Sequence, residues 1–111
     1  MRDQPIEAGE YKCCEFKVHC RSENVARGVE GSIQTKSEKF GIEVRIRIQG
    51  GILVQGVVLY RGEDCERNRR HMKDYLERFV RRDGVNEVRY RGATKAACQM
   101  FELPEEAVKV A

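Results

Sequence analysis

Cysteine and histidine are the side chains in this sequence that could bind a metal ion or carry redox chemistry. The five cysteines are Cys13, Cys14, Cys20, Cys65 and Cys98. Zinc sites bring their ligands close together, commonly through Cys-x-x-Cys pairs, and no such pair occurs here. The two histidines, His19 and His71, also lack a partner at ligand spacing. We therefore expect no metal site and no cofactor, and we interpret the cysteines as small buried hydrophobic residues.

The number of cysteines also bears on the compartment. An odd set of scattered cysteines does not suit a disulfide framework and favours a reducing, cytoplasmic environment. The first residues, Met1–Glu7, contain no apolar core of a secretory signal. The longest nearly apolar run, Ile52–Tyr60, is far shorter than the ~20 residues of a membrane span. We expect a cytoplasmic protein with no membrane partner.

Catalytic chemistry finds little support in the sequence. It contains no recognisable Ser/His/Asp set, no pair of catalytic carboxylates and no phosphate-binding P-loop. Hydrophobic residues make up 41% of the chain and charged residues 35%, which indicates a globular protein, and the net charge of +3 is only mildly basic. We predict no catalytic residue and favour a binding protein over an enzyme.

Periodicity predicts two half-buried strands and one long helix. Residues 11–20 and 85–91 alternate between apolar and polar side chains, as strands with one buried face do. Residues 64–82 repeat apolar side chains at helical spacing, with Asp64 as N-cap and Gly84 as the stop. The predicted apolar stripe of this helix is Cys65, Met72, Tyr75, Leu76 and Phe79. This helix is expected to pack on the sheet through that stripe.

A hairpin is predicted in the middle of the chain. Residues 42–48 alternate, whereas residues 52–60 are apolar on both faces, as in a central strand. Gly50-Gly51 can supply a two-residue turn, because glycine adopts positive φ angles without strain. Pairing Gln49 with Ile52 across this turn fixes the register. It places Ile48 opposite Leu53, Val44 opposite Val57 and Ile42 opposite Leu59.

Two segments admit more than one structure. Residues 22–40 favour a helix that begins after the N-cap Ser22 and ends at Gly41, with a strand over residues 29–37 as the alternative. Residues 93–103 suit either a last strand or a short helix. With these elements the chain is predicted to be a single two-layer α+β domain over residues 11–111, preceded by a flexible arm over residues 1–10. Its sheet is expected to be mostly antiparallel, with helices on one face, in a ferredoxin-like or KH-like order.

Basic residues gather on one face of the predicted sheet. Because alternate residues of a strand point to opposite faces, five cations share the face that points away from the helices. They are Lys17, Arg45, Arg47, Arg89 and Arg91. Such a face can follow the phosphate backbone of a single nucleic-acid strand. The same alternation turns Phe16 and Tyr90 inward, so no aromatic platform for stacking bases is expected there.

A second candidate for nucleic-acid binding is the segment Gly28-Val29-Glu30-Gly31. It follows the first strand and precedes the hairpin and the long amphipathic helix, and in this order residues 16–82 resemble a K-homology (KH) domain. The resemblance implies that Gly28 and Gly31 belong to a loop between two helices, which clamps the backbone of a short single strand. Glycines there would let phosphate oxygens approach backbone N–H groups. Glu30 stands where such loops usually carry a basic residue.

The sequence thus predicts a small cytoplasmic binding protein whose partner is single-stranded RNA, held by the basic sheet face or by the Gly28–Gly31 loop. The alternative is a protein-interaction domain or a homo-oligomeric structural domain, such as a homodimer, with no nucleic-acid role. Acidic residues on the same sheet face, Glu15, Glu43 and Glu87, allow cross-strand ion pairs that suit this alternative.

Overall fold

The structure is a computed structural model that describes residues 12–60 and 65–103. In these ranges the chain forms, in order, β1 (Lys12–Cys20), α1 (Glu23–Phe40), β2 (Glu43–Gln49), β3 (Leu53–Tyr60), α2 (Cys65–Glu77), the 3₁₀ helix η2 (Arg78–Arg81), β4 (Val85–Gly92) and α3 (Lys95–Met100). The predicted arm over residues 1–10 and the predicted cap Asp64 lie outside the described residues.

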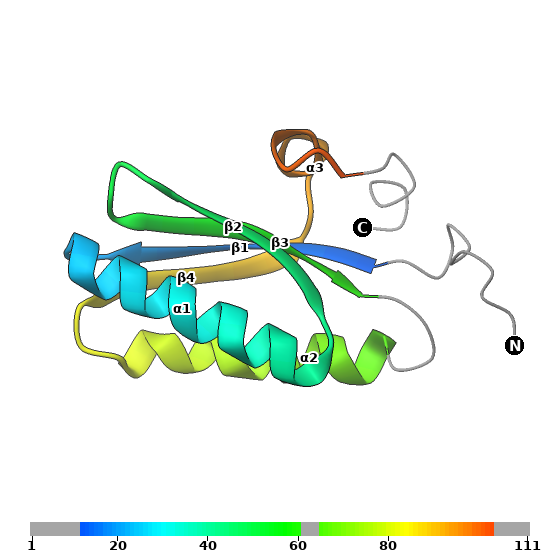
Figure 1. Cartoon of the computed structure of the whole chain (residues 1–111), viewed down its shortest axis with the longest axis horizontal. Coiled ribbons are helices and arrows are strands. Elements are labelled where there is room, and N and C mark those ends of the chain that lie inside the picture. Colours follow the sequence, from blue (N-terminus) through cyan, green and yellow to red (C-terminus); the bar gives the residue numbers. More distant parts are fainter. Residues whose placement is uncertain (1–11, 61–64, 104–111) are drawn as a thin grey trace, which may run out of the picture.

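The four strands form one antiparallel sheet in the order β2-β3-β1-β4. Helices α1 and α2 lie side by side against one face of this sheet (Figure 1). The first strands and helices follow the β-α-β-β-α-β order of the split βαβ, or ferredoxin-like, sandwich, with η2 continuing α2. The predicted α+β class, the mostly antiparallel sheet and the central position of β3 are confirmed.

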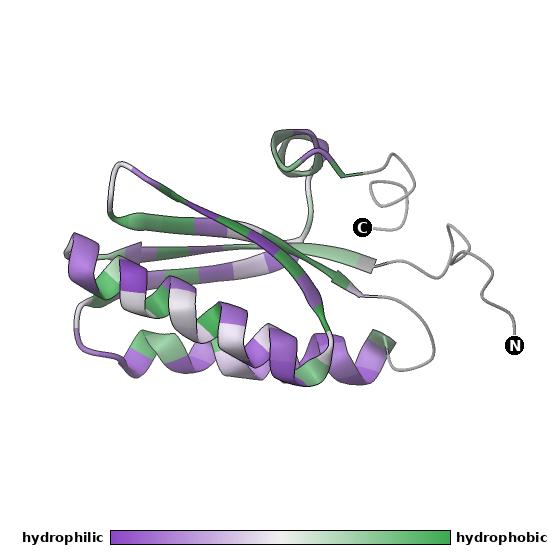
Figure 2. Ribbon diagram, viewed as in Figure 1, coloured by the Kyte–Doolittle hydropathy of each residue, from purple (hydrophilic) through white to green (hydrophobic). Residues whose placement is uncertain are grey.

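The main core lies between the sheet and the two long helices. Its largest fully buried side chains are Phe16, Val18, Val29, Ile33, Val54, Val58, Tyr60, Met72 and Leu76. Hydrophobic and hydrophilic residues alternate along β2 and along α1, as elements with one buried face require (Figure 2). The predicted stripe of the second long helix is confirmed. Within the described residues the helix is not uniform: α2 ends at Glu77, and η2 continues it to Arg81.

The hairpin between β2 and β3 forms, but its predicted register is wrong by one residue. Gln49 pairs with Leu53 and Ile48 with Val54, so the turn contains three residues instead of two. Gly50 and Gly51 both have positive φ angles, of 60° and 78°, and Ile52 completes the turn by donating its N–H to the carbonyl of Gln49. Since side chains alternate between faces, the extra residue turns Leu53, Val57 and Leu59 away from the helices.

Residues 23–40 form one continuous helix, which confirms the preferred prediction for this segment. The hydroxyl of Ser22 accepts a hydrogen bond from the N–H of Val25, and Gly41 ends the helix with a φ of 67°. The predicted loop at Gly28–Gly31 is wrong, because both glycines lie inside α1. Glycine destabilises the interior of a helix, and burial of the other side of α1 compensates for this. The buried residues there are Ala26, Val29, Ile33 and Ser37.

The segment after β4 forms the short helix α3, one of the two structures predicted for it. It does not join α1 and α2: it lies on the opposite face of the sheet, over one end (Figure 1). Here Ala97, Cys98 and Phe101 pack against the second apolar face of β3 and against Cys13. The prediction that helices cover one face therefore holds for α1 and α2 but not for α3. None of the helices within the described residues is long and apolar enough to cross a membrane.

Candidate nucleic-acid interface

The register of the sheet places the predicted cations in two neighbouring rows on the face opposite α1 and α2. Arg47 pairs with Gln55, Gln55 with Lys17, and Lys17 with Arg89, so these four residues form one row across all four strands. The adjacent row consists of Arg45, Val57, Glu15 and Arg91. The prediction that the five cations share a face is confirmed, and the two rows differ in what surrounds them.

The row of Arg45, Val57, Glu15 and Arg91 lies next to α3, and its charged side chains form a hydrogen-bonded network. Glu15 is only 5% exposed, and its carboxylate accepts hydrogen bonds from the backbone N–H and the hydroxyl of Thr94, the N-cap of α3, at 2.7 and 2.8 Å. Arg91 forms an ion pair with the same carboxylate at 3.2 Å. Arg45 donates to the carbonyl of Phe101 at 2.8 Å. Arg45 and Glu15 therefore hold α3 on the sheet, and Arg91 neutralises the Glu15 carboxylate.

The pKa of Glu15 reflects this network. Burial alone would raise it, but the two hydrogen bonds from Thr94 and the nearby Arg91 guanidinium together lower it below the usual value of 4.5. A carboxylate with a lowered pKa in the folded state stabilises the protein above the pKa of the unfolded chain. That contribution is lost as the pH falls through the folded pKa.

We expect the variant Glu15→Gln to lower the free energy of unfolding by about 1–3 kcal/mol at neutral pH, because it weakens hydrogen bonds to a buried charged group. The difference from the wild type should stay constant above about pH 5.5 and shrink below about pH 4.5 as the wild-type carboxylate takes up a proton. Urea denaturation of both proteins between pH 7 and pH 3 measures this. A difference that grew toward acid pH would contradict the lowered pKa.

The row of Arg47, Gln55, Lys17 and Arg89 lies at the open end of the face, and its charged side chains have fewer ion-pair partners. Arg89 forms an ion pair with Glu87 at 2.8 Å, but neither Lys17 nor Arg47 has an ion-pair partner among residues 12–60 and 65–103. Gln55 lies between them and is 7% exposed. Its side-chain oxygen, Oε1, is buried and accepts no hydrogen bond from any described residue. A buried acceptor of this kind costs about 1–3 kcal/mol if it stays unpaired.

Gln55 is the residue that the sequence analysis missed. The signal was visible, because Gln55 is the one polar side chain within the otherwise apolar stretch Ile52–Tyr60. The prediction that the aromatic side chains turn inward is confirmed: Phe16 is fully buried in the main core, and the hydroxyl of Tyr90 lies 2.7 Å from that of Tyr60. On the described part of the open face, therefore, no aromatic ring is available to stack on a base.

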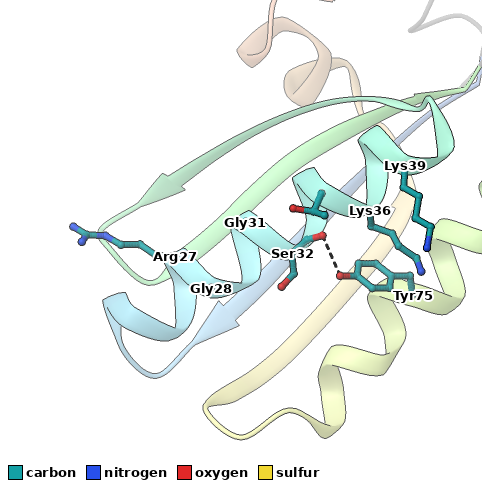
Figure 3. A pocket seen from close by; sticks show the side chains of 8 residues that line it. Arg27, Gly28, Gly31, Ser32, Lys36, Lys39 and Tyr75 are labelled. Carbon is teal, nitrogen blue, oxygen red and sulfur yellow. Dashed lines mark hydrogen bonds between the residues drawn. The ribbon is translucent and has the colours of Figure 1, made fainter.

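Gly28 and Gly31 lie far from these rows, on the outer side of the helical layer. They line an open groove with a volume of about 600 Å³ between α1 and α2 (Figure 3). The other residues that line it are Arg27, Ser32, Thr35, Lys36, Lys39 and Tyr75. The structure thus separates the predicted nucleic-acid-binding residues into two surfaces: the five sheet cations on one side and the two glycines on the other.

The cysteines are all buried, as predicted. The sulfur atoms of Cys13 and Cys98 lie 3.9 Å apart under α3, and burial raises the pKa of both thiols. Within the described ranges no group of three or more His, Cys, Asp or Glu side chains is arranged to hold a metal ion.

The sequence matches no known family model and no curated protein. The function must therefore be inferred from the chain's own residues and their geometry.

Proposed function

We propose that the protein binds single-stranded RNA across the open end of its sheet, at the row formed by Arg47, Gln55, Lys17 and Arg89. The observation that carries this proposal is the unpaired, buried Oε1 of Gln55, a residue that lies in the row between two cations with no acidic partner among the described residues. With the Gln55 amide turned so that Oε1 faces outward, a ligand that donates to this oxygen and presents negative charge on both sides would satisfy all three groups.

The dimensions of the row suit an extended strand. Neighbouring strands are about 4.8 Å apart, so the cations of β2, β1 and β4 span roughly 14 Å across the sheet. Lys17, Arg47 and Arg89 would contact phosphates, which position a nucleic acid without reading its sequence. Gln55 would accept a hydrogen bond from a 2′-hydroxyl, a donor that RNA has and DNA lacks. The proposal therefore includes a preference for RNA.

Without aromatic rings, this face lacks the stacking that contributes about 1–3 kcal/mol per base in many single-strand binders. Binding should then be mainly electrostatic and tolerant of sequence. Its logarithmic salt dependence should have a slope of about −0.7 for each phosphate that is neutralised.

We expect Lys17→Glu combined with Arg47→Glu to weaken RNA binding by at least about tenfold at ~50 mM salt, where electrostatic contacts are strongest. Fluorescence anisotropy with a labelled oligouridylate about 12 nucleotides long measures the affinity. Arg47 is exposed and Lys17 partly so, so the fold should survive both changes, which circular dichroism checks. The matched control is Lys73→Glu with Arg81→Glu, the same charge change at exposed positions of the helical layer. Equal losses of RNA affinity in the two double variants would contradict a binding site on the sheet.

The role of Gln55 has a separate test. The variant Gln55→Leu keeps a similar shape and removes the unpaired oxygen, so we expect it to fold normally. It should lower the affinity for oligouridylate to that for oligodeoxyuridylate, which differs by the 2′-hydroxyl. Light scattering on the same proteins tests the alternative function. No RNA binding at low salt, together with a dimer that Lys17→Glu and Arg47→Glu convert to a monomer, would replace RNA binding by homodimerisation.

A further inference from the structure

The groove between α1 and α2 is a second concave surface, on the side of the molecule opposite the open sheet face. Its volume of about 600 Å³ falls within the range of roughly 300–1,000 Å³ that is usual for small-molecule sites. Tyr75 of α2 forms one wall, and its hydroxyl donates to the backbone carbonyl of Ser32 at 3.1 Å (Figure 3). This hydrogen bond fixes the ring across the gap between the two helices.

The two glycines leave different surroundings on the α1 side of the groove. A Cβ atom at Gly31 would meet no atom within 4 Å. At Gly28, a Cβ atom would lie 2.9 Å from Nη2 of Arg82, so the absence of a side chain lets this guanidinium rest on the helix. Arg82 thus adds positive charge beside the Gly28 end of the groove.

The chemistry of the lining is cationic. Arg27, Lys36 and Lys39 line the groove, and none of its described lining residues is acidic. Arg27 has a distant partner in Glu23, at 3.7 Å, but Lys36 and Lys39 form no ion pair with any described acid. The ammonium of Lys36 lies over the rings of Phe40 and Tyr75, at 5.2 and 5.1 Å from their centroids.

Two hydroxyls stand beside these ammonium groups. Ser32 precedes Lys36 by four residues and Thr35 precedes Lys39 by four, so the four side chains share one helical face within about two turns. Figure 3 shows the Lys36 and Lys39 side chains extending from α1 toward α2. The cluster therefore offers two point charges and two hydroxyl donors over a short distance, which suits a ligand with several anionic oxygens close together.

We propose that this groove binds a small molecule that carries a chain of linked phosphates. A single carboxylate of an acidic peptide offers only two anionic oxygens, whereas successive phosphates present several, enough for both lysines and both hydroxyls. The volume is larger than one inorganic anion fills, and the cations continue to Arg27 and Arg82 at the other end. The same chemistry is found in inorganic tripolyphosphate and in nucleoside triphosphates.

The test is a pair of titrations of the ¹⁵N-labelled protein, one with sodium tripolyphosphate and one with ATP in the absence of divalent cations. Both are monitored by ¹H–¹⁵N correlation spectra at constant ionic strength. The expected result is a saturable shift of the amide signals of residues 27–39 and 75. Tighter binding of ATP would assign the nucleoside to the groove as well, and equal or tighter binding of tripolyphosphate would assign the phosphate chain alone. No saturable shift of these signals with either ligand would overturn the proposal.

The decisive variant is Gly31→Leu, which fills the groove and leaves every charge in place. Leucine has a higher helix propensity than glycine and Gly31 is exposed, so the variant should fold. It should weaken binding by at least about tenfold, as should Lys36→Gln with Lys39→Gln. The matched control, Lys73→Gln with Arg81→Gln, removes the same charge elsewhere on the helical layer and should leave the affinity within about threefold. Wild-type affinity in Gly31→Leu, or equal losses in the two charge variants, would show that the anion does not use the groove.

The proposed phosphate site in the groove and the proposed RNA site on the sheet can be tested independently of each other. Gly31→Leu should leave oligouridylate binding unchanged. The variant with Lys17→Glu and Arg47→Glu should still bind tripolyphosphate at the groove, with the same amide signals shifted.

Discussion

Replacing Leu76 by alanine is expected to lower the free energy of unfolding by about 2–5 kcal/mol. Leu76 lies on α2, is fully buried and belongs to the core between the sheet and the long helices. The substitution removes most of an apolar side chain and leaves a cavity, because surrounding side chains from α1, η2 and the sheet can close only part of the space. Equilibrium denaturation by urea measures the loss as a lower midpoint with an unchanged slope.

The neighbouring residue on the same helix is the control. Glu77 is exposed, so Glu77→Ala should change the free energy of unfolding by no more than about 0.5 kcal/mol. An unchanged midpoint for Leu76→Ala would mean that α2 packs on the sheet through a different face. The RNA affinity of folded Leu76→Ala should match that of the wild type, because the helices lie on the other side of the sheet from the proposed interface.

The parts of the fold that could be predicted from the sequence are those in which local pattern and tertiary packing agree. Along β1 the apolar residues alternate from Cys14 to Cys20, and the face that carries Phe16 and Val18 is the one that the main core buries. In the same way, Ser22 and Gly41 mark the two ends of α1 by their capping chemistry alone. The shared face of the five cations followed from this alternation.

The errors arose where the structure depends on contacts distant in sequence. The Gly28-x-x-Gly31 pattern is compatible with a loop, and it forms a helix because Ala26, Val29 and Ile33 are buried on the opposite side of α1. The hairpin register depends on one residue, Ile52, that joins the turn rather than the strand. Neither outcome has a strong local signal, since glycine tolerates many backbone conformations.

The sequence of β3 contained information about the position of α3 and about Gln55 that our prediction did not use. β3 is apolar on both faces, which requires a cover on the side opposite the long helices, and α3 supplies it over Val57 and Leu59. Gln55 interrupts this second apolar face beyond the part that α3 covers. Its burial without a partner depends on the side chains of neighbouring strands, so only the assembled sheet reveals it.

Substituting alanine for Gly56 in β3 is expected to cost about 3 kcal/mol or more, although strand propensity alone would favour alanine. Gly56 pairs with Phe16 of β1 and with Ile46 of β2. A Cβ atom there would overlap the backbone carbonyl oxygen of Arg45 and lie 2.6 Å from Cζ of the Phe16 ring. Phe16 is fully buried and a backbone carbonyl cannot move freely, so the strands must separate. Thermal and urea denaturation measure the loss.

The control is the same substitution at Gly31, where the expected sign is opposite. Gly31 lies in the interior of α1, and a Cβ atom there meets nothing within 4 Å, so Gly31→Ala should stabilise the protein by about 0.5–1 kcal/mol through helix propensity. Both variants add one methyl group, so opposite signs would show that crowding at Gly56 outweighs any gain in backbone propensity. Stabilisation of the protein by Gly56→Ala would mean that the Phe16 ring does not pack over β3, and the burial of the central strand would then need another explanation.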